Sequence, residues 1–272
     1  MLSFPNCKIN LGLHVTEKRS DGFHNIDTIM VPIEWNDILE IIPDTNSNAT
    51  TDFKCTGTRL YGPKEKNLCL QGYNLLATHY SLPPVKIQLH KIIPVGAGLG
   101  GGSSDAAHTL LLLNKIFNLK ISDTELEGYS SQLGSDCPFY IRNRIVHATG
   151  KGEIFDPIKL KLKNVFCVII KPRVHISTAS AYSQIKPRKR DKSLKELIEA
   201  PIKDWKDLIE NDFEKAILET NPTIKNIKNR LYKLGAIYSS MSGSGSAVYG
   251  LFSEEKHLNT YFRSSLVWSG RL

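Results

Sequence analysis

The sequence predicts an α+β protein in which a glycine-rich loop connects a strand to a helix. Residues 85–93 alternate apolar and polar side chains, as a strand with one buried face does. Residues 94–107 read PVGAGLGGGSSDAA, and a run of helical composition continues to residue 117. A strand, a glycine loop and a helix in this order make a phosphate site. The first amides of the helix lack partners and carry the positive end of its dipole.

Length and composition exclude several classes of protein. The chain has 272 residues, 41% hydrophobic and 23% charged, which suits one large or two modest globular domains. No apolar run approaches the roughly 20 residues that cross a bilayer, and the first residues, MLSFPNCKIN, do not resemble a signal peptide. Five cysteines without C-x-x-C spacing predict neither a zinc site nor disulfides, so we expect a cytoplasmic protein. A net charge of +8 suits nucleic acid or small polyanions as partners.

Two well-known nucleotide loops do not fit the glycine run. Three of its glycines satisfy G-x-G-x-x-G, but a dinucleotide-binding unit also needs an acidic residue at the end of the next strand. Beyond this helix, the next acidic residues are Asp123 and Glu125, which open another helix behind Ser122 as a capping box. A Walker loop needs Lys and then Ser or Thr, where this chain has Gly102 and Ser103.

The glycine run therefore predicts a phosphate-holding loop of a third kind. Five glycines occupy the seven positions from residue 96 to residue 102, a concentration with a high cost in backbone entropy for a simple connection. We expect Gly100–Gly102 to adopt backbone angles or close approaches that a Cβ would forbid. We also expect Gly101→Val to abolish ATP binding in a protein that still folds. The hydroxyls of Ser103 and Ser104 add ligands for phosphate or Mg²⁺.

A second candidate region is the strand expected at residues 7–15, CKINLGLHV, which alternates strictly. Lys8 and Asn10 share one face with Gly12 and His14. A lysine and an asparagine that project together suit a phosphate and a hydroxyl. Taken alone, this face is accounted for more simply by contact with solvent at the edge of a sheet.

Other candidate residues also have an ordinary structural explanation. Asn67 precedes a helical run and is at least as well explained as its N-cap. Phe23 and His24 follow a turn, where packing at a strand end explains them as well as a ligand does. Tyr182 lies in a short helical segment and fits the core equally well.

Asp136 lies between a helix end and an aromatic stretch, directly before Cys137 and Pro138. Capping of the next turn is the default role for an aspartate in this position. Because proline disfavours helical angles at the preceding residue, Cys137 is expected to be extended. We expect its thiol to serve packing rather than chemistry.

PVGAGLGGGSSDAA resembles the phosphate loop of the GHMP kinases, which include galactokinase, homoserine kinase, mevalonate kinase and phosphomevalonate kinase. Three further segments match in the same order and at similar spacing, so the resemblance covers nearly the whole chain: PNCKINLGLHVTEKRSDGFHNIDT, LGSDCPFYI and MSGSGSAVYGLF. It implies a two-lobed GHMP-kinase-like fold, with an ATP-binding N-terminal domain at residues 1–158 and a C-terminal domain at residues 159–272. It also implies that the last segment folds against the first glycine loop.

The opening segment favours the branch that uses ATP and Mg²⁺ to phosphorylate the 2-hydroxyl of a cytidine diphosphate derivative of methylerythritol, on the route to isoprenoid precursors. In that branch Lys8 and Asp136 match the catalytic positions. Asp136 accepts the hydroxyl proton, and Lys8 keeps it ionised and steadies the migrating phosphoryl group. No side chain is assigned to the metal.

The resemblance also implies the residues that bind each substrate. ATP is placed at Pro94, Val95, Gly96, Ala97, Gly98, Leu99, Gly100, Gly101, Gly102, Ser103, Ser104 and Asn67. The acceptor is placed at Asn10, Phe23, His24, Thr178 and Tyr182, with the aromatic residues at the cytosine. The family more often has tyrosine at position 23, so Phe23 keeps a stacking face without the hydroxyl.

Two alternatives remain open from the sequence. One is a GHMP kinase for another alcohol, of the mevalonate or homoserine type. The other is a nucleotide sensor without turnover, which loss of Lys8 or Asp136 would have indicated. The basic run Lys186–Lys192 has no interleaved aromatic residues and is expected to be a solvated loop, not a nucleic-acid surface.

Overall fold

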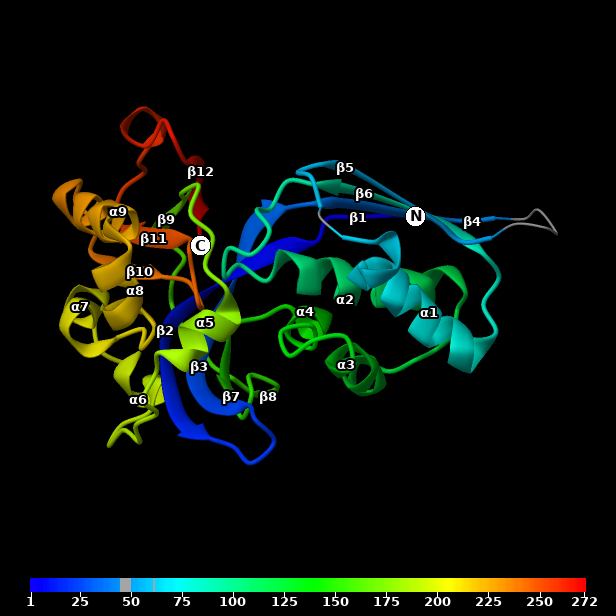
Figure 1. The fold of residues 1–272 in the computed structure, drawn as a ribbon, viewed down its shortest axis with the longest axis horizontal. Coiled ribbons are helices and arrows are strands. Elements are labelled where there is room, and N and C mark those ends of the chain that lie inside the picture. Colours follow the sequence, from blue (N-terminus) through cyan, green and yellow to red (C-terminus); the bar gives the residue numbers. More distant parts are fainter. Residues whose placement is uncertain (45–49, 61) are drawn as a thin grey trace. The chain divides into compact units, whose positions relative to one another are not determined.

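The computed structural model describes residues 1–44, 50–60 and 62–272, which form two compact units (Figure 1). Unit 1 comprises Met1–Cys7, Glu34–Val95 and Gly100–Arg144, and unit 2 comprises Lys8–Ile33, Gly96–Leu99 and Ile145–Leu272. The units interleave along the chain, and β2 (Asn6–Lys18) and β3 (His24–Asn36) contribute residues to both. A division by sequence order at residue 158 stays a prediction.

Unit 1 combines a sheet with helices. Its elements are β1 (Leu2–Ser3), β4 (Ile38–Pro43), β5 (Asp52–Gly57), η1 (Lys64–Lys66), α1 (Leu68–Tyr80), β6 (Val85–Lys91), α2 (Gly101–Ile116), α3 (Asp123–Ser131) and α4 (Phe139–Arg142). The sheet has the order β1-β4-β6-β5, in which β4 pairs with β6 antiparallel and β5 pairs with β6 parallel.

The expected strand at residues 85–93 is confirmed as β6, whose side chains are alternately buried and exposed from Val85 to Lys91. The expected helices also form. The Ser122–Glu125 capping box at the start of α3 is present. Helices α1 and α2 pack closely, since a Cβ added to Gly72 would lie 3.5 Å from Leu110 Cδ2. These elements place the glycine loop between the end of β6 and the start of α2.

Unit 2 contains most of the second half of the chain. Its further elements are β7 (Val146–Thr149), β8 (Ile154–Pro157), β9 (Phe166–Lys171), α5 (Thr178–Ser183), α6 (Leu194–Leu197), η2 (Ile202–Asp204), α7 (Trp205–Leu208), α8 (Glu214–Thr220), α9 (Pro222–Lys233), β10 (Tyr238–Met241), β11 (Val248–Phe252), η3 (Asn259–Tyr261) and β12 (Leu266–Arg271). One sheet has the order β10-β11-β9-β12 and is antiparallel throughout. The other, β2-β3-β7-β8, includes the strand that carries Lys8 and Asn10.

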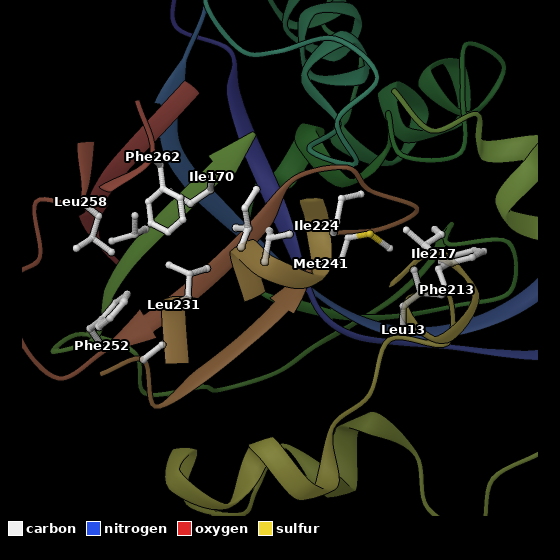
Figure 2. Packing of buried hydrophobic residues seen from close by; sticks show 14 of the residues in the cluster. Leu13, Ile170, Phe213, Ile217, Ile224, Leu231, Met241, Phe252, Leu258 and Phe262 are labelled. Carbon is white, nitrogen blue, oxygen red and sulfur yellow. The ribbon is translucent and has the colours of Figure 1, made fainter. Parts of the chain in front are cut away.

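The core of unit 2 packs α9 and α8 against the β10-β11-β9-β12 sheet (Figure 2). The buried residues of α9 are Ile224, Ile227 and Leu231, whose spacing puts them on one face of the helix. They belong to one hydrophobic cluster with Val168 and Ile170 of β9. Complete burial of a side chain of this size stabilises a fold by about 1.5–3 kcal/mol, so this face fixes the sheet from which the second glycine loop extends.

Several expectations about composition can be compared with the structure. All five cysteines carry free thiols. In the described ranges, which omit residues 45–49 and 61, no helix has both the length and the apolar character needed to cross a membrane. The basic run forms a loop without helix or strand, in which Arg190 pairs with Asp212 and, at 3.2 Å, with Glu210.

Candidate active site

The glycine loop has an alternating conformation. Gly96, Gly98 and Gly100 have φ angles of +62°, +77° and +70°, in the left-handed region that favours glycine. Ala97 and Leu99, which lie between them, are 2% and 1% exposed. The side chains of the alternate residues therefore anchor the loop, while the glycines turn its backbone. Pro94 is also buried, whereas Val95 is exposed.

A second loop, Ser242–Ala247, connects β10 to β11 and packs on Gly96–Leu99. Ser242 Oγ donates a 2.8 Å hydrogen bond to the carbonyl of Gly98, and Ala247 N donates a 3.1 Å bond to the carbonyl of Ala97. A Cβ on Gly98 would lie 2.0 Å from the carbonyl oxygen of Ser242. The expected contact between the two glycine loops is confirmed, and it requires glycine at position 98.

The expectation for Gly100–Gly102 holds only in part. Gly100 has a left-handed backbone, and a Cβ on Gly101 would lie 2.7 Å from Ile93 Cγ2 and 2.9 Å from Lys91 Nζ. A Cβ on Gly102 would meet nothing nearer than Leu68 Cδ1 at 3.9 Å, so the expectation is wrong for Gly102. The expected folding of Gly101→Val stays a prediction, and the variant would have to displace the side chains of Ile93 and Lys91.

Helix α2 begins at Gly101, directly after the loop, with Gly100 as an N-cap that provides no side-chain hydrogen bond. The first intrahelical bond runs from Ser104 N to Gly100 O at 3.0 Å. The amides that precede Ser104 therefore have no hydrogen-bond partner within the helix. Ser104 Oγ is buried without a hydrogen-bond partner, and Ser103 is half-buried. A phosphate group suits such a helix start because its oxygens accept hydrogen bonds and its charge matches the helix dipole.

Both faces of β2 are buried, so the expectation of a solvated face is wrong. Lys8 is 3% exposed and Asn10 is 1% exposed. Lys8 Nζ donates a 2.6 Å hydrogen bond to Asn10 Oδ1, and Asn10 Nδ2 donates a 3.0 Å bond to Thr28 Oγ1. This chain of hydrogen bonds holds the ammonium and the amide in fixed orientations.

The backbone of β2 also joins both glycine loops. Lys8 N donates a 3.0 Å hydrogen bond to Leu99 O in the first loop. Asn10 N donates a 3.3 Å bond to Ser242 Oγ in the second loop. Unit 2 thus brings Lys8, Asn10, Gly98 and Ser242 together through hydrogen bonds between segments far apart in sequence.

Three aromatic rings of unit 2, those of His24, Tyr182 and Phe213, form one aromatic group. The imidazole of His24 stacks on Tyr182 with ring centroids 4.8 Å apart and an interplanar angle of 23°. Phe213 meets Tyr182 nearly at right angles, at 4.9 Å and 85°. Burial, followed by the charge of Lys18, lowers the pKa of His24, which favours the neutral imidazole. Tyr182 thus packs on the core, as one interpretation expected, and also contacts His24.

Phe23 and Thr178 lie beside this aromatic group in different ways. Phe23 is 54% exposed, and Lys151 Nζ lies 4.9 Å from the centroid of its ring. The hydroxyls of Thr178 and Ser244 are 3.1 Å apart, so α5 is hydrogen-bonded to the second glycine loop. Of these two residues expected at the acceptor, Phe23 therefore presents an exposed ring, whereas Thr178 is hydrogen-bonded to the second glycine loop.

Asp136 lies half-buried in the turn between α3 and α4. It is not the cap of α4, whose N-cap is Pro138 without a side-chain hydrogen bond. Cys137 is in this turn rather than extended, because its amide donates to Gly134 O at 3.1 Å and its carbonyl accepts from Tyr140 N at 3.1 Å. These bonds outweigh the preference for extended backbone before proline.

The thiol of Cys137 serves packing, as expected. It is 0% exposed, and burial raises its pKa to about 12 against a smaller opposing effect of its hydrogen bond with Ser103. The bond also ties the turn of Asp136 to the first turn of α2 within unit 1. Asn67 is the N-cap of α1, with Oδ1 accepting a 2.9 Å hydrogen bond from Cys69 N.

A buried charged cluster in unit 1 escaped the sequence analysis. Lys91 is 2% exposed, forms an ion pair with Asp37, and lies 2.9 Å from Asp105 Oδ2. Asp37 also accepts hydrogen bonds from the amides of Ile92 and Ile93, where the chain leaves β6. The available signal was a lysine at a position that the alternation of β6 assigns to the buried face.

In this cluster one ammonium contacts two carboxylates, and the two carboxylates have different hydrogen-bond partners. Asp37 has two backbone amides as additional donors, whereas Asp105 Oδ1 has no hydrogen-bond partner. Burial raises the pKa of Asp105 to about 7, and the nearby charge of Asp37 adds to this against the opposing effect of Lys91. Burial lowers the pKa of Lys91, but the two carboxylates outweigh it and leave this pKa raised.

In the described part of the chain, no group of three or more His, Cys, Asp and Glu side chains could hold a metal ion.

A left-handed glycine loop before a helix, bonded to a second glycine–serine loop, is an arrangement that suits a phosphate group. Models of the GHMP kinases N terminal domain and the GHMP kinases C terminal match residues 67–143 and 193–260. The chain belongs to the GHMP kinase family.

The relatives define the branch within this family. The chain is 47% identical over 274 residues, with 100% of both chains covered, to the 4-diphosphocytidyl-2-C-methyl-D-erythritol kinase of Parabacteroides distasonis. It is 50% identical over 258 residues to the Bacteroides fragilis enzyme of that name, covering 95% of this chain and 94% of the relative. A crystal structure of 4-(cytidine 5'-diphospho)-2C-methyl-D-erythritol kinase matches with a TM-score of 0.83 at 30% identity, over 99% of this chain and 98% of the other. Within the GHMP kinases the chain thus belongs with these enzymes.

Proposed function

We propose that this protein transfers the γ-phosphoryl group of ATP to the 2-hydroxyl of 4-diphosphocytidyl-2-C-methyl-D-erythritol, a step toward isoprenoid precursors. The observation that carries the proposal is the bonded pair of glycine loops, with Lys8 hydrogen-bonded to the first loop and Asn10 to the second. Family membership supports the kinase activity, and the names of the relatives support the acceptor.

ATP binds along the glycine loop and at the start of α2. The loop backbone comes close to the phosphates because glycine has no side chain to hold them away. The amides of the first turn of α2, together with the hydroxyls of Ser103 and Ser104, then donate hydrogen bonds to phosphate oxygens. Asn67 caps α1 through Oδ1, so its amide nitrogen is the part that would reach the nucleotide.

Mg²⁺ accompanies the nucleotide and offsets the charge of its phosphates. The unpartnered hydroxyl of Ser104 and the half-buried Ser103 can supply the few protein oxygens it needs.

Lys8 and Asp136 carry the chemistry. Asp136 orients the acceptor hydroxyl and takes its proton, and Lys8 balances the negative charge on the transferred group. Lys8 belongs to unit 2 and Asp136 to unit 1. The bond from Lys8 Nζ to Asn10 Oδ1 holds the ammonium in place, which is the positioning that phosphoryl transfer requires.

The cytosine binds at the aromatic group. His24 and Tyr182 are stacked with centroids 4.8 Å apart, too close for a pyrimidine to lie between them. The base therefore stacks on the exposed ring of Phe23, with a neutral His24 available for a hydrogen bond. Thr178, bonded to Ser244 of the second loop, lies where the acceptor meets the phosphate side of the site.

An assay of ADP release tests the function. Purified protein with ATP and Mg²⁺ is offered the cytidyl acceptor, mevalonate, homoserine or galactose in separate reactions. Turnover with the cytidyl acceptor alone is expected. Turnover with another alcohol would replace the proposed acceptor, and ATP binding without any turnover would support a nucleotide sensor.

Two further features belong to the proposal. The five free thiols suit a reducing compartment, so we place the protein in the cytoplasm. The boundary between the N-terminal and C-terminal sequence domains falls near residue 158, in the connection from β8 to β9.

A further inference from the structure

One segment of unit 2 contacts both the second glycine loop and the aromatic group. Asn211, Asp212 and Phe213 lie between α7 and α8, and Glu214 is the first residue of α8. Their side chains have different partners, and the sequence analysis assigned none of them to the site. Asn211, Phe213 and Glu214 are at most 8% exposed, so their contacts are made within the protein.

Asn211 fixes the entrance of the second loop. Its amide nitrogen donates hydrogen bonds of 2.8 Å to Met241 O and 2.9 Å to Gly243 O. Its carbonyl oxygen accepts a 3.0 Å bond from Phe213 N. The two carbonyls flank Ser242, whose hydroxyl holds Gly98. A buried amide with all these bonds made is costly to replace, because each lost bond leaves a buried polar group unsatisfied.

Glu214 fixes the same entrance through the amide of Met241. Its Oε1 accepts a 2.7 Å hydrogen bond from Met241 N and a 3.2 Å bond from Ser240 Oγ. Its other oxygen pairs with Lys228 of α9. Met241 is thus held at its amide by Glu214 and at its carbonyl by Asn211.

The segment is also fixed to the strand that carries Lys8 and Asn10. Leu13 N donates a 2.9 Å bond to Glu210 O, and Asp212 N donates a 2.8 Å bond to Leu13 O. Asp212 Oδ2 accepts a 2.8 Å bond from Val15 N. These bonds set the segment in register on β2, so the loop is positioned relative to that strand.

Phe213 extends the contacts of the segment to the aromatic group. It is 2% exposed and packs in the hydrophobic cluster near Leu13 and Ile217 (Figure 2). Its ring meets Tyr182 at 4.9 Å, and Tyr182 in turn stacks on His24. Removal of the Phe213 ring would leave Tyr182 without this support.

We propose that Asn211 and Glu214 are positioning residues for the loop Ser242–Ala247, and that Phe213 is a positioning residue for the Tyr182–His24 pair. The assignment rests on the proposed function, because it equates the loop with the phosphate side and the rings with the acceptor side. The segment of residues 211–214 then positions both the phosphate side and the acceptor side of the site, through different side chains.

The test is a reciprocal pattern of kinetic effects. Asn211→Ala is expected to raise KM for ATP and lower kcat, with a combined loss in kcat/KM of about tenfold or more. KM for the cytidyl acceptor should change little. Phe213→Leu is expected to raise KM for the acceptor by a similar factor and leave ATP binding nearly unchanged. If Asn211→Ala does not fold, Asn211→Ser, which keeps one donor, is measured and should show a smaller loss of the same kind.

Two matched variants control for simple loss of stability. Asn114→Ala removes an amide that bonds to the backbone of Ile121 at 2.9 and 3.1 Å, and Phe252→Leu alters a buried ring of the same hydrophobic cluster. Both should lower the unfolding temperature without changing either KM. Equal effects of Asn211→Ala and Phe213→Leu on both substrates, or effects on stability alone, would overturn the assignment.

The outcome for the wild type separates this inference from the proposed function. Turnover of the cytidyl acceptor by the wild type establishes the function before any variant is compared. If the wild type turns over no acceptor, ADP binding is measured by calorimetry for the wild type and Asn211→Ala. Weaker binding by the variant supports the positioning of the loop, and equal binding overturns it.

Discussion

The hydroxyl of Ser242 donates a 2.8 Å hydrogen bond to the carbonyl oxygen of Gly98, joining two glycine loops that are 144 residues apart in sequence. The same serine accepts a 3.3 Å hydrogen bond from the amide of Asn10. One side chain therefore fixes the loop that follows β6 relative to the strand that carries Lys8. The backbone of Ser242 lies so close to Gly98 that position 98 has no room for a side chain.

Gly98→Ala should weaken ATP binding and destabilise the protein. The added Cβ would lie 2.0 Å from Ser242 O, and alanine is strained at a φ of +77°. The left-handed strain alone is roughly 1–2 kcal/mol. The control is Gly235→Ala, with a φ of +95° but no neighbour within 4 Å of the added Cβ. Denaturant unfolding and ATP calorimetry should show a larger loss for Gly98→Ala in both. Equal losses would remove the loop contact from the explanation.

Gly102→Ala should weaken ATP binding without destabilising the protein. The nearest protein atom to its added Cβ is Leu68 Cδ1 at 3.9 Å, and the position lies in the first turn of α2. An alanine inside a helix stabilises it by about 0.5–1 kcal/mol relative to glycine. Gly128→Ala in α3, with nothing within 4 Å, should give a similar gain without an effect on ATP. Unchanged ATP affinity in Gly102→Ala would remove this residue from the nucleotide site.

His24→Ala should raise KM for the cytidyl acceptor about tenfold or more and leave ATP binding nearly unchanged. The variant loses the proposed hydrogen bond to the base, worth roughly 1–3 kcal/mol, and the stack on Tyr182. Phe23→Ala should act in the same direction through loss of the stacking face, and Phe23→Tyr should not. Steady-state kinetics with each substrate varied in turn provides the measurement. If KM for ATP rises equally, the aromatic group has a structural role only.

Asp136→Asn should lower kcat by about 10²–10⁴, the usual range for loss of a general base, with ATP affinity little changed. The amide keeps the size of the carboxylate but cannot take the proton. Asp123→Asn is the matched control, an exposed carboxylate of the same unit that pairs with Arg142 at 3.5 Å. Normal turnover by Asp136→Asn would show that Asp136 is not the base and would favour the sensor interpretation.

Asp105→Asn should remove a pH dependence of stability. The pKa of Asp105 is raised to about 7 in the folded protein, so below that pH the folded state binds a proton that the unfolded state releases above about pH 4. The unfolding free energy should therefore fall as pH rises between these values, by up to about 1.4 kcal/mol per pH unit. Urea unfolding of both proteins at pH 5 and pH 8 measures this. From pH 5 to pH 8 the unfolding free energy of the wild type should fall relative to that of the variant. An equal difference in unfolding free energy at the two pH values would contradict the raised pKa of Asp105.

The sequence by itself predicted several of the elements that carry the candidate site residues. The alternation of β6 and the capping box before α3 were readable because they depend on residues within a few positions of one another. The left-handed backbone of Gly100 agrees with the expectation for that residue, because glycine adopts a positive φ without a steric penalty. The prediction for Gly102 was wrong because no other segment lies close to that glycine. A local sequence pattern does not show which distant segments come close to a given residue.

Only the tertiary structure decided which polar residues are buried and what they contact. Alternation put Lys8 and Asn10 on one face of β2, but burial of that face depends on segments up to 232 residues away, such as Ser242. Likewise, the two carboxylates that pair with Lys91 come from positions 37 and 105. Local patterns report the preferences of neighbouring residues, whereas a buried charge or amide is stable only where distant segments supply its partners.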